Sequence, residues 1–270
     1  MTGPTGQRVG SSPDGSPGAA QLVPDNSPDP LVLTGERTLP GIAHENYWFR
    51  RHEAAYRALL PFVQGASVLE AGCGEGYGAA ALRERARSVL AVDYDVPAAT
   101  HARATYPEID VVRGDLQRLP LADGAVEVVS NLQVIEHLWD QPAFIAECAR
   151  VLRPAGTLLI TTPNRITFSP GRDTPLNPFH TRELSAAELA ELLDRDFIVT
   201  RMMGLGHGPR LRRWERRHGS VMDAQLDGPP ETWSPALRSF VAGVSADDFM
   251  VSAADVDASL DLVAVAYRRP

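Results

Sequence analysis

A glycine-rich turn constrains the fold of this chain more than any other feature. A short apolar run at 67–69 ends in an acid, and three glycines follow at alternate positions: Glu70, Gly72, Gly74 and Gly76. This order predicts a strand, a tight turn and the start of a helix, because glycine permits the turn and lets a ligand lie against the backbone. The dinucleotide-binding pattern G-x-G-x-x-G would require a glycine where Tyr77 stands, so the loop is E-x-G-x-G-x-G instead.

The composition excludes several kinds of chemistry and partner. All 26 basic residues are arginine, and a chain without lysine cannot form a Walker A loop or a pyridoxal Schiff base. The net charge of −8 disfavours a nucleic-acid partner, whose binding depends on neutralising phosphates. Cys73 and Cys148 are too few for a disulfide framework and lack metal-ligand spacing. Because no apolar run is long enough to cross a bilayer, we expect a soluble, cytoplasmic protein without a membrane partner.

The pattern along the chain predicts one α/β domain behind a tail. Residues 1–30 are rich in Pro, Gly, Ser and Asp and are expected to be disordered, whereas 31–270 can form a domain that begins with an aromatic-rich helix at 46–60. Strands and helices then alternate, which indicates a Rossmann-like fold: a doubly wound, mostly parallel, seven-stranded sheet with helices on both faces. The predicted strands are 67–70, 88–93, 110–113, 126–131, 156–162, 197–203 and 260–267.

The segment 204–258, between the last two predicted strands, reads as an irregular insertion. It carries five arginines within 210–217, followed by Pro-rich and Asp-rich stretches. We favour a solvated helix face for the arginine run. The alternatives are a lid over the active site or a subunit contact, and the second would make the protein a homodimer.

Candidate ligand-binding residues follow the ends of four predicted strands. Ligands of open α/β sheets bind at this edge, near the switch in strand order. Glu70 and the glycines follow the first strand, and Asp93 ends the second, where an acid can accept hydrogen bonds from both ribose hydroxyls. Asp115 follows the third strand, and 131–133 end the fourth. Four such positions in register are hard to explain as turn residues alone.

The stretch 68–164 resembles the class I S-adenosylmethionine (SAM) methyltransferases. The resemblance rests on the glycine loop, on the acids at the strand ends and on R-V-L-R-P-A-G at 150–156, which matches the family's R-x-L-x-P-G-G turn with Ala155 in place of the first glycine. It implies SAM as the methyl donor. The implied cofactor-binding residues are Glu70 in the loop, Gly72, Gly74 and Gly76 along the methionine part, Asp93 at the ribose, Asp115 and the Leu116 backbone at the adenine amine, and Gln133 near the methionine carboxylate and sulfonium.

His137, just beyond the fourth predicted strand, is the candidate catalytic base. An alcohol is a weak nucleophile at neutral pH, so a base or a metal must help it to lose its proton. Histidine titrates in the suitable range, and its position in the run V-I-E-H-L places it where the methyl group should point. The alternative is a structural histidine at the start of the next helix. Glu136 is expected to face the scaffold.

Two flanking segments are expected to shape the acceptor pocket. One follows the fifth strand and is rich in polar and aromatic groups suited to sugar hydroxyls; we expect Asn164, His180 and Arg182 to bind substrate there. The other is the aromatic helix before the first strand, from which we expect Tyr47 and Arg50 to contribute. Packing against the sheet is the alternative role for the aromatic residues of that helix.

A narrower resemblance covers nearly everything after the tail. The runs TGERTLPGIAHENYWFRRHEAAY, NLQVIEHLWDQ, TPNRITFSPGRDTPLNPFHTREL and SLDLVAVA are similar to the actinobacterial 1-O-methyltransferases of methylmannose polysaccharide biosynthesis. This similarity implies a small carbohydrate acceptor, methylated at the reducing-end hydroxyl of a short 3-O-methylated mannoside, with magnesium as a further cofactor. The rival functions are a quinone or small-metabolite O-methyltransferase, a nicotinamide-dependent oxidoreductase, and a SAM-binding module without catalysis.

Overall fold

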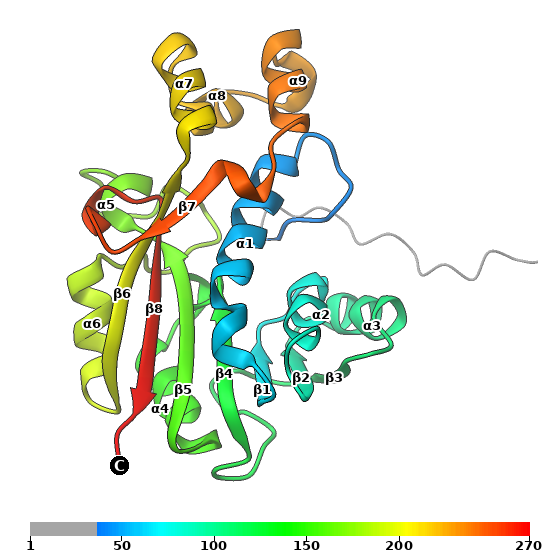
Figure 1. Cartoon of the computed structure of the whole chain (residues 1–270), viewed down its shortest axis with the longest axis vertical. Coiled ribbons are helices and arrows are strands. Elements are labelled where there is room, and N and C mark those ends of the chain that lie inside the picture. The colour runs from blue at the N-terminus through cyan, green and yellow to red at the C-terminus, as the bar shows by residue number, and fades with distance from the viewer. Residues whose placement is uncertain (1–36) are drawn as a thin grey trace, which may run out of the picture.

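The architecture is a single eight-stranded sheet covered by helices. A computed structural model describes residues 37–270, so the tail predicted to be disordered at 1–30 lies outside the described residues. The strand order across the sheet is β3-β2-β1-β4-β5-β8-β6-β7 (Figure 1). The strands are β1 (Ser67–Ala71), β2 (Ser88–Asp93), β3 (Asp110–Arg113), β4 (Val126–Leu132), β5 (Leu152–Pro163), β6 (Phe197–His207), β7 (Phe249–Ser252) and β8 (Asp261–Arg268).

The sheet is mostly parallel, as predicted, but it has eight strands within the described residues rather than seven. Strands β1 to β5 pair in parallel, and β8 enters antiparallel between β5 and β6. The strand that the prediction missed is β7, which pairs with the end of β6 through Gly204 to His207. Its run F-M-V-S is four residues long and lies among acidic and small residues, which explains why periodicity did not reveal it.

Helices cover both faces of the sheet, as expected. They are α1 (Asn46–Leu59), α2 (Tyr77–Arg83), α3 (Val96–Thr105), α4 (Gln141–Val151), α5 (Arg165–Phe168), α6 (Ala186–Asp194), α7 (Pro209–His218), α8 (Val221–Leu226) and α9 (Pro235–Ala242), with short 3₁₀ turns η1 (Leu60–Val63), η2 (Ile135–His137), η3 (Pro230–Thr232), η4 (Ala246–Asp248) and η5 (Val256–Ala258). One buried cluster joins α1, α2 and α3 to the sheet, and a second joins α4 and α6 to the opposite face. The helix predicted at 46–60 is confirmed as α1.

Local signals in the sequence account for several helix starts. Ser185 and Glu188 form a capping box at the start of α6, and the Asp140 carboxylate accepts a hydrogen bond from the Ala143 N–H at the start of α4. Asp95 differs: it precedes α3 but makes no side-chain cap, because its carboxylate pairs with Arg37 at 2.8 Å. None of the helices in the described part of the chain is long and apolar enough to cross a membrane.

The segment between β6 and β8 is folded, contrary to the prediction that 204–258 is irregular. It holds α7, α8, α9 and β7, and Figure 1 shows the three helices at the end of the molecule toward which β6 runs. The arginine run lies on α7, where residues 212, 213, 216 and 217 are exposed. Arg210 pairs with Asp248 at 2.6 Å, so one end of this helix is tied to the neighbouring 3₁₀ turn. The favoured interpretation of a solvated helix face fits this placement.

Candidate functional site

The glycine loop after β1 adopts conformations that demand glycine. Gly72, Gly74 and Gly76 have φ angles of +86°, +51° and +104°, a region that other residues rarely occupy. A Cβ at Gly72 would lie 2.6 Å from Val134 in the loop after β4, so the two loops are in contact. A Cβ at Gly74 would meet nothing within 4 Å. The loop therefore packs tightly on one side and leaves room beside Gly74, as the predicted cofactor site requires.

Asp93 joins the glycine loop to the end of β2. Its carboxylate accepts a hydrogen bond from the Gly74 N–H at 2.7 Å and another from the Asp95 N–H at 2.9 Å. Because each carboxylate oxygen can accept more than one hydrogen bond, these contacts leave capacity for ribose hydroxyls. The role of Asp93 in binding ribose stays a prediction, and its position beside the loop agrees with it.

The other predicted cofactor residues are placed at the same edge of the sheet. Asp115 is exposed after β3, its Oδ1 accepting from the Gln117 N–H at 2.9 Å, while Leu116 is buried. Gln133 follows β4 with φ +57° and donates from Nε2 to Thr161 at 3.2 Å. A non-glycine residue at such an angle is uncommon and is held by its surroundings. Gln133 also lines the central cavity described below.

Glu70 is the predicted cofactor residue that faces the protein interior. Its side chain is buried, and Oε1 accepts a hydrogen bond from the Tyr56 hydroxyl of α1 at 2.5 Å. Burial raises the pKa of Glu70 to about 7. In the described structure this carboxyl group therefore ties β1 to α1 and does not open toward the space beside Gly74.

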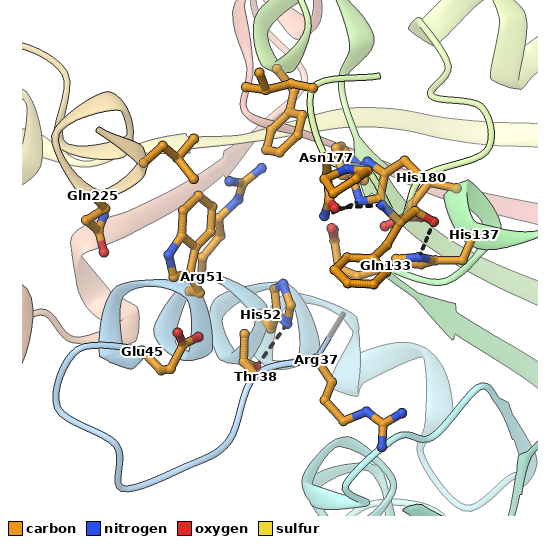
Figure 2. Close-up of a pocket in the computed structure, with 18 of the residues that line it drawn as sticks. Arg37, Thr38, Glu45, Arg51, His52, Gln133, His137, Asn177, His180 and Gln225 are labelled. Atoms are coloured by element: carbon orange, nitrogen blue, oxygen red, sulfur yellow. Dashed lines mark hydrogen bonds between the residues drawn. The ribbon is translucent and has the colours of Figure 1, made fainter. Parts of the chain in front are cut away.

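A central cavity of about 420 Å³ lies beside this edge of the sheet. It is lined by the segment before α1, by α1, by the loops after β4 and β5, and by α8 with the turn that follows it. Figure 2 shows Thr38, Arg51 and His52 on one side of it and His137, Asn177 and His180 on the other. Two tryptophans, Trp48 and Trp233, complete the lining. Aromatic surface and hydrogen-bonding groups therefore converge on one space.

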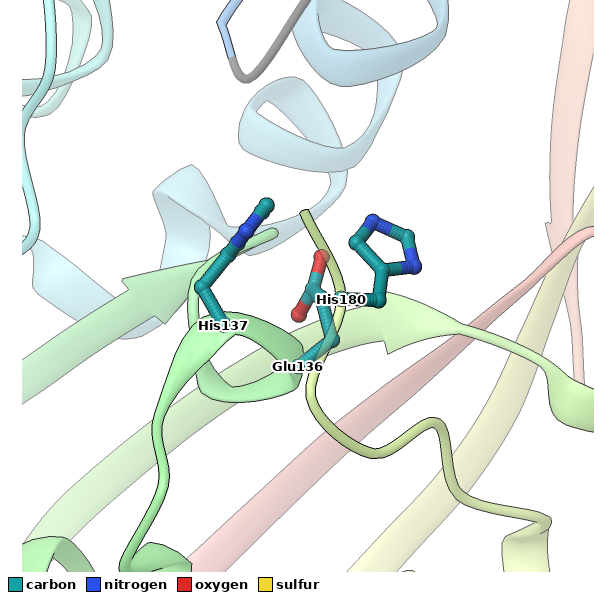
Figure 3. Close-up of side chains that lie close together, drawn as sticks. All are labelled: Glu136, His137 and His180. Atoms are coloured by element: carbon teal, nitrogen blue, oxygen red, sulfur yellow. The ribbon is translucent and has the colours of Figure 1, made fainter. Parts of the chain in front are cut away.

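Glu136, His137 and His180 form a cluster in the wall of this cavity, here called the Glu136–His137–His180 cluster. One possible ligand atom from each lies within 4.8 Å of those of the other two, and Figure 3 shows the Glu136 carboxylate between the two rings. Glu136 belongs to η2. It is 1% exposed, and Thr162 of β5 donates to its carboxylate at 2.9 Å, so it faces the scaffold as expected, but it also contributes to the cavity lining. Burial raises the pKa of Glu136 to about 7.

Both histidines of the cluster are held in one tautomer. Nδ1 of His137 lies 3.1 Å from the Phe179 carbonyl oxygen; a carbonyl can only accept, so Nδ1 carries the hydrogen and Nε2 has the free lone pair. Nδ1 of His180 donates to Glu183 at 2.7 Å. Burial, together with His180, lowers the pKa of His137 to about 4. His137 is therefore neutral near pH 7 and can accept a proton or bind a metal through Nε2.

Four predicted substrate-binding residues do not line the cavity. Tyr47 is fully buried with its hydroxyl 2.7 Å from His207, and Arg50 pairs with Glu53. Asn164 is fully buried, and its amide donates to three backbone carbonyls at residues 256, 257 and 259. Arg182 is exposed, away from the cavity lining. His180 is the predicted acceptor residue that does line it.

Several lining residues were missed in the sequence because nothing local marks them. Trp233 comes from the turn after α8, in a segment that was expected to be irregular. Thr38 belongs to the stretch before α1 and lies 3.2 Å from the Tyr77 hydroxyl at the start of α2. Long-range packing brings both residues to the cavity. Thr38 lies in the run TGERTLPGIAHENYWFRRHEAAY, but nothing within that run distinguishes it from its neighbours. The polar run around 177–183 was the signal that pointed to His180, which lines the cavity.

Comparison with known proteins agrees with this geometry. Residues 69–160 match a family model described as a methyltransferase domain. The chain is 56% identical over 256 residues to a probable S-adenosylmethionine-dependent methyltransferase of Mycolicibacterium smegmatis, covering 91% of this chain and 98% of that protein. A probable S-adenosylmethionine-dependent methyltransferase of Mycobacterium tuberculosis is also 56% identical, with 90% and 91% of the two chains covered.

More distant similarities cover less of the chain or the fold alone. A ubiquinone biosynthesis O-methyltransferase of Rhizobium rhizogenes is 31% identical over 107 residues, which cover 38% of this chain and 43% of that one. The crystal structure of an S-adenosylmethionine-dependent methyltransferase from Mesorhizobium loti superposes with a TM-score of 0.53 at 20% identity, covering 81% of this chain and 98% of the other. The latter likeness identifies the fold.

Proposed function

This chain belongs to the S-adenosylmethionine-dependent methyltransferases, and we propose that it methylates a hydroxyl group of a small carbohydrate. The narrower proposal is the reducing-end 1-OH of a short 3-O-methylated mannoside, which rests on the sequence resemblance. The observation that carries the carbohydrate proposal is the lining of the central cavity. Trp48 and Trp233 contribute aromatic surface to the lining, and Thr38, His52 and Asn177 contribute hydrogen-bonding groups. Sugar rings present an apolar face and several hydroxyls, so this mixture is complementary to them.

Methyl transfer to a hydroxyl requires both alignment and loss of a proton. The acceptor oxygen forms a bond to the methyl carbon while the carbon–sulfur bond breaks, its electron pair stays on sulfur, and the hydroxyl proton departs. Alignment alone contributes up to about 7–11 kcal/mol in model reactions. We assign loss of the proton to the Glu136–His137–His180 cluster, because His137 presents an unprotonated Nε2 in the cavity lining, which can act either as a base or as a ligand of a metal ion that acidifies the hydroxyl. Gln133 lines the same cavity beside the predicted cofactor loop.

A panel of acceptors tests the carbohydrate proposal directly. With labelled SAM, we expect turnover with short methylated mannosides and none with catechols that imitate a reduced quinone. The product should gain one methyl group, and NMR should place it on an oxygen. Turnover of a catechol with no activity on mannosides would instead assign the chain to the quinone O-methyltransferases, in line with its partial similarity to one of them.

A pair of tryptophan variants tests whether the central cavity is the acceptor site. Trp233→Ala removes an aromatic wall of the cavity, so the KM for the mannoside should rise while SAM affinity is retained. Trp139→Ala is the matched control, because Trp139 is 89% exposed and does not line the cavity. Equal effects of the two substitutions on KM would place the acceptor elsewhere.

The predicted cofactor role of Asp93 is tested by calorimetry. Asp93→Ala removes the carboxylate that would accept the ribose hydroxyls, so SAM binding should weaken by about 1–3 kcal/mol, the usual size for a hydrogen bond to a charged group. Asp93→Asn is the control that retains an acceptor for the Gly74 N–H. Unchanged SAM affinity in a folded Asp93→Ala protein would contradict the assignment.

A further inference from the structure

We propose that Glu136, His137 and His180 bind a divalent transition-metal ion such as Zn²⁺. Two come from η2, after β4, and the third from the loop between α5 and α6. Their ligand atoms lie within 4.8 Å of one another, and Figure 3 shows the three side chains converging. Bonds of about 2.0–2.1 Å to a tetrahedral zinc ion place ligand atoms about 3.3 Å apart. Small side-chain rotations would therefore close the site around an ion.

Each histidine of the cluster donates a hydrogen bond from Nδ1 to a second residue outside the cluster. Phe179 accepts from Nδ1 of His137, and Glu183 accepts from Nδ1 of His180 at 2.7 Å. The remaining ring nitrogen of both histidines is Nε2. Metal-binding histidines usually donate their other ring N–H to a carbonyl or a carboxylate, which fixes the tautomer and orients the ring. Both forms of this support occur here, one at each histidine.

The charge around the cluster also favours a cation. Glu136 and Glu183 are 1% and 2% exposed, and a buried carboxylate is costly unless a cation or several hydrogen bonds compensate it. Arg51 lines the same cavity, but its guanidinium is committed to Asp261 through two hydrogen bonds. Oε2 of Glu183 has no hydrogen-bond partner among the described residues. A divalent ion would supply positive charge beside the buried carboxylates of Glu136 and Glu183.

The donor set disagrees with the magnesium ion that the sequence resemblance implied. Magnesium prefers oxygen ligands in octahedral geometry, whereas imidazole nitrogen suits zinc, cobalt, nickel and copper. Two imidazoles and one carboxylate match the ligands of catalytic zinc sites, which keep a fourth position for water or substrate. We therefore expect Zn²⁺ and Co²⁺ to bind well and Mg²⁺ to bind poorly.

Asn177 occupies the position that the ion would take at His180. Its amide nitrogen donates to Nε2 of His180 at 3.1 Å, and its Oδ1 accepts from the Phe179 N–H, which sets the orientation of the amide. A bound ion would replace this hydrogen bond. The proposal thus predicts that removing Asn177 preserves or strengthens metal binding, which a purely polar network would not explain.

A catalytic role for the bound ion rests on the proposed methyl transfer to a hydroxyl. Metal binding itself does not depend on that proposal. Glu136, His137 and His180 would hold the ion, which would supply the Lewis acidity that lowers the pKa of an acceptor hydroxyl, as zinc does for water. The hydroxyl proton would be lost to solvent while the methyl group transfers and the carbon–sulfur electron pair stays on sulfur. In this arrangement His137 is a metal ligand and not the proton acceptor.

Cobalt provides a direct test on the full chain without an affinity tag. After chelator treatment and dialysis, Co²⁺ titration should give one equivalent of binding with the strong visible absorption of a four-coordinate site, and Zn²⁺ should displace the ion. His137→Ala and His180→Ala should each weaken Co²⁺ binding at least about tenfold, the lower end of the loss seen even for outer-partner substitutions. Glu136→Gln should act in the same direction.

Controls separate the site from adventitious binding and from misfolding. His44→Ala is the matched control, because His44 lines the same cavity outside the cluster; it should leave Co²⁺ binding unchanged. Asn177→Ala should bind Co²⁺ at least as tightly as the parent protein. Retained SAM binding by calorimetry shows that each variant is folded.

Two outcomes would overturn the metal proposal. One is the absence of Co²⁺ and Zn²⁺ binding at micromolar concentrations in the parent protein, and the other is binding that survives the His137→Ala/His180→Ala double substitution. Because these measurements use no acceptor, their failure leaves the carbohydrate proposal standing. Conversely, metal binding without turnover of any mannoside would contradict the proposed carbohydrate acceptor and leave the metal site standing.

Discussion

Glu70 is a carboxyl group enclosed by protein, and its ionisation costs the folded state free energy. Its pKa is raised to about 7 by burial, whereas in the unfolded chain it is near 4.5. Between these pH values the unfolded state releases the proton and the folded state keeps it. The free energy of unfolding therefore falls as pH rises from about 4.5 to about 7, and this contribution is constant above that range.

Glu70→Gln should remove this pH dependence. Each pH unit between the two pKa values corresponds to about 1.4 kcal/mol, so the stability of Glu70→Gln relative to the parent should rise by up to about 3 kcal/mol between pH 4.5 and pH 7.5. Urea unfolding of the SAM-free proteins at several pH values measures this difference. Glu84→Gln, at an exposed position, is the matched control for the loss of a carboxyl group. A difference for Glu70→Gln that does not change with pH would contradict the raised pKa of Glu70.

At the residue scale, the sequence predicts which residues meet at the strand ends better than it predicts which residues line the cavity. Gly74 and Asp93 stand at strand ends, where the chain direction alone brings them together, and the structure places them 2.7 Å apart. Tyr47 and Asn164 were chosen by residue type, yet both are fully buried and satisfied within the protein. A polar or aromatic side chain in a loop can complete the core as readily as it can bind a sugar, and sequence alone does not distinguish the two.

At the scale of elements, the beginning of β5 contains a residue in a conformation that suits glycine. Ala155 has φ +59° and is exposed, at the position where the methyltransferase turn carries its first glycine. A left-handed conformation costs an L-residue about 1–2 kcal/mol, and glycine avoids this cost. Glycine also increases the conformational entropy of the unfolded chain, which lowers the free energy of unfolding by about 0.4–1 kcal/mol.

Ala155→Gly should therefore stabilise the protein by about 0.5–1 kcal/mol, measured by the urea unfolding midpoint. The adjacent Gly156→Ala should do the opposite, because its new Cβ would lie 2.9 Å from the Arg153 carbonyl oxygen and 3.1 Å from that of Glu127. A loss of stability in Ala155→Gly would show that the turn gains nothing from glycine.

Elements with strong periodicity were predicted closely, and the short helices of the segment 204–258 were not. The buried runs of β1, β2 and β4 each carry a local signal, and the structure has them within one residue of the predicted bounds. The helices α7, α8 and α9 are six to ten residues long, and their formation depends on packing at the end of the sheet. Short helices are marginal without tertiary contacts, so their patterns were weak.

At the scale of the whole molecule, a buried ion pair joins the first described helix to the last strand. Arg51 of α1 and Asp261 of β8 are 2% and 1% exposed, and Nε of Arg51 donates to Asp261 at 2.6 Å. Removing one partner of such a pair leaves an uncompensated buried charge, which typically costs about 3–5 kcal/mol.

Asp261→Asn should therefore lower the free energy of unfolding by about 3–5 kcal/mol, measured by urea denaturation. Asp247→Asn is the matched control: Asp247 pairs with Arg57, but it is 89% exposed, and exposed pairs contribute at most about 1 kcal/mol. If the two variants unfolded at the same urea concentration, the buried pair would not be the link between α1 and β8.

The place of β8 between β5 and β6 has a consequence for how the protein is made. During synthesis the ribosome releases β5 roughly a hundred residues before β8, yet β8 is the partner that joins it to β6. Until 261–268 emerge, the nascent sheet is split into two parts, each with an unpaired edge that invites aggregation. During this interval Arg51 also lacks its ion-pair partner, Asp261. The loops after β4 and β5 and helix α8, which line the central cavity, are therefore joined through one sheet only once β8 has emerged.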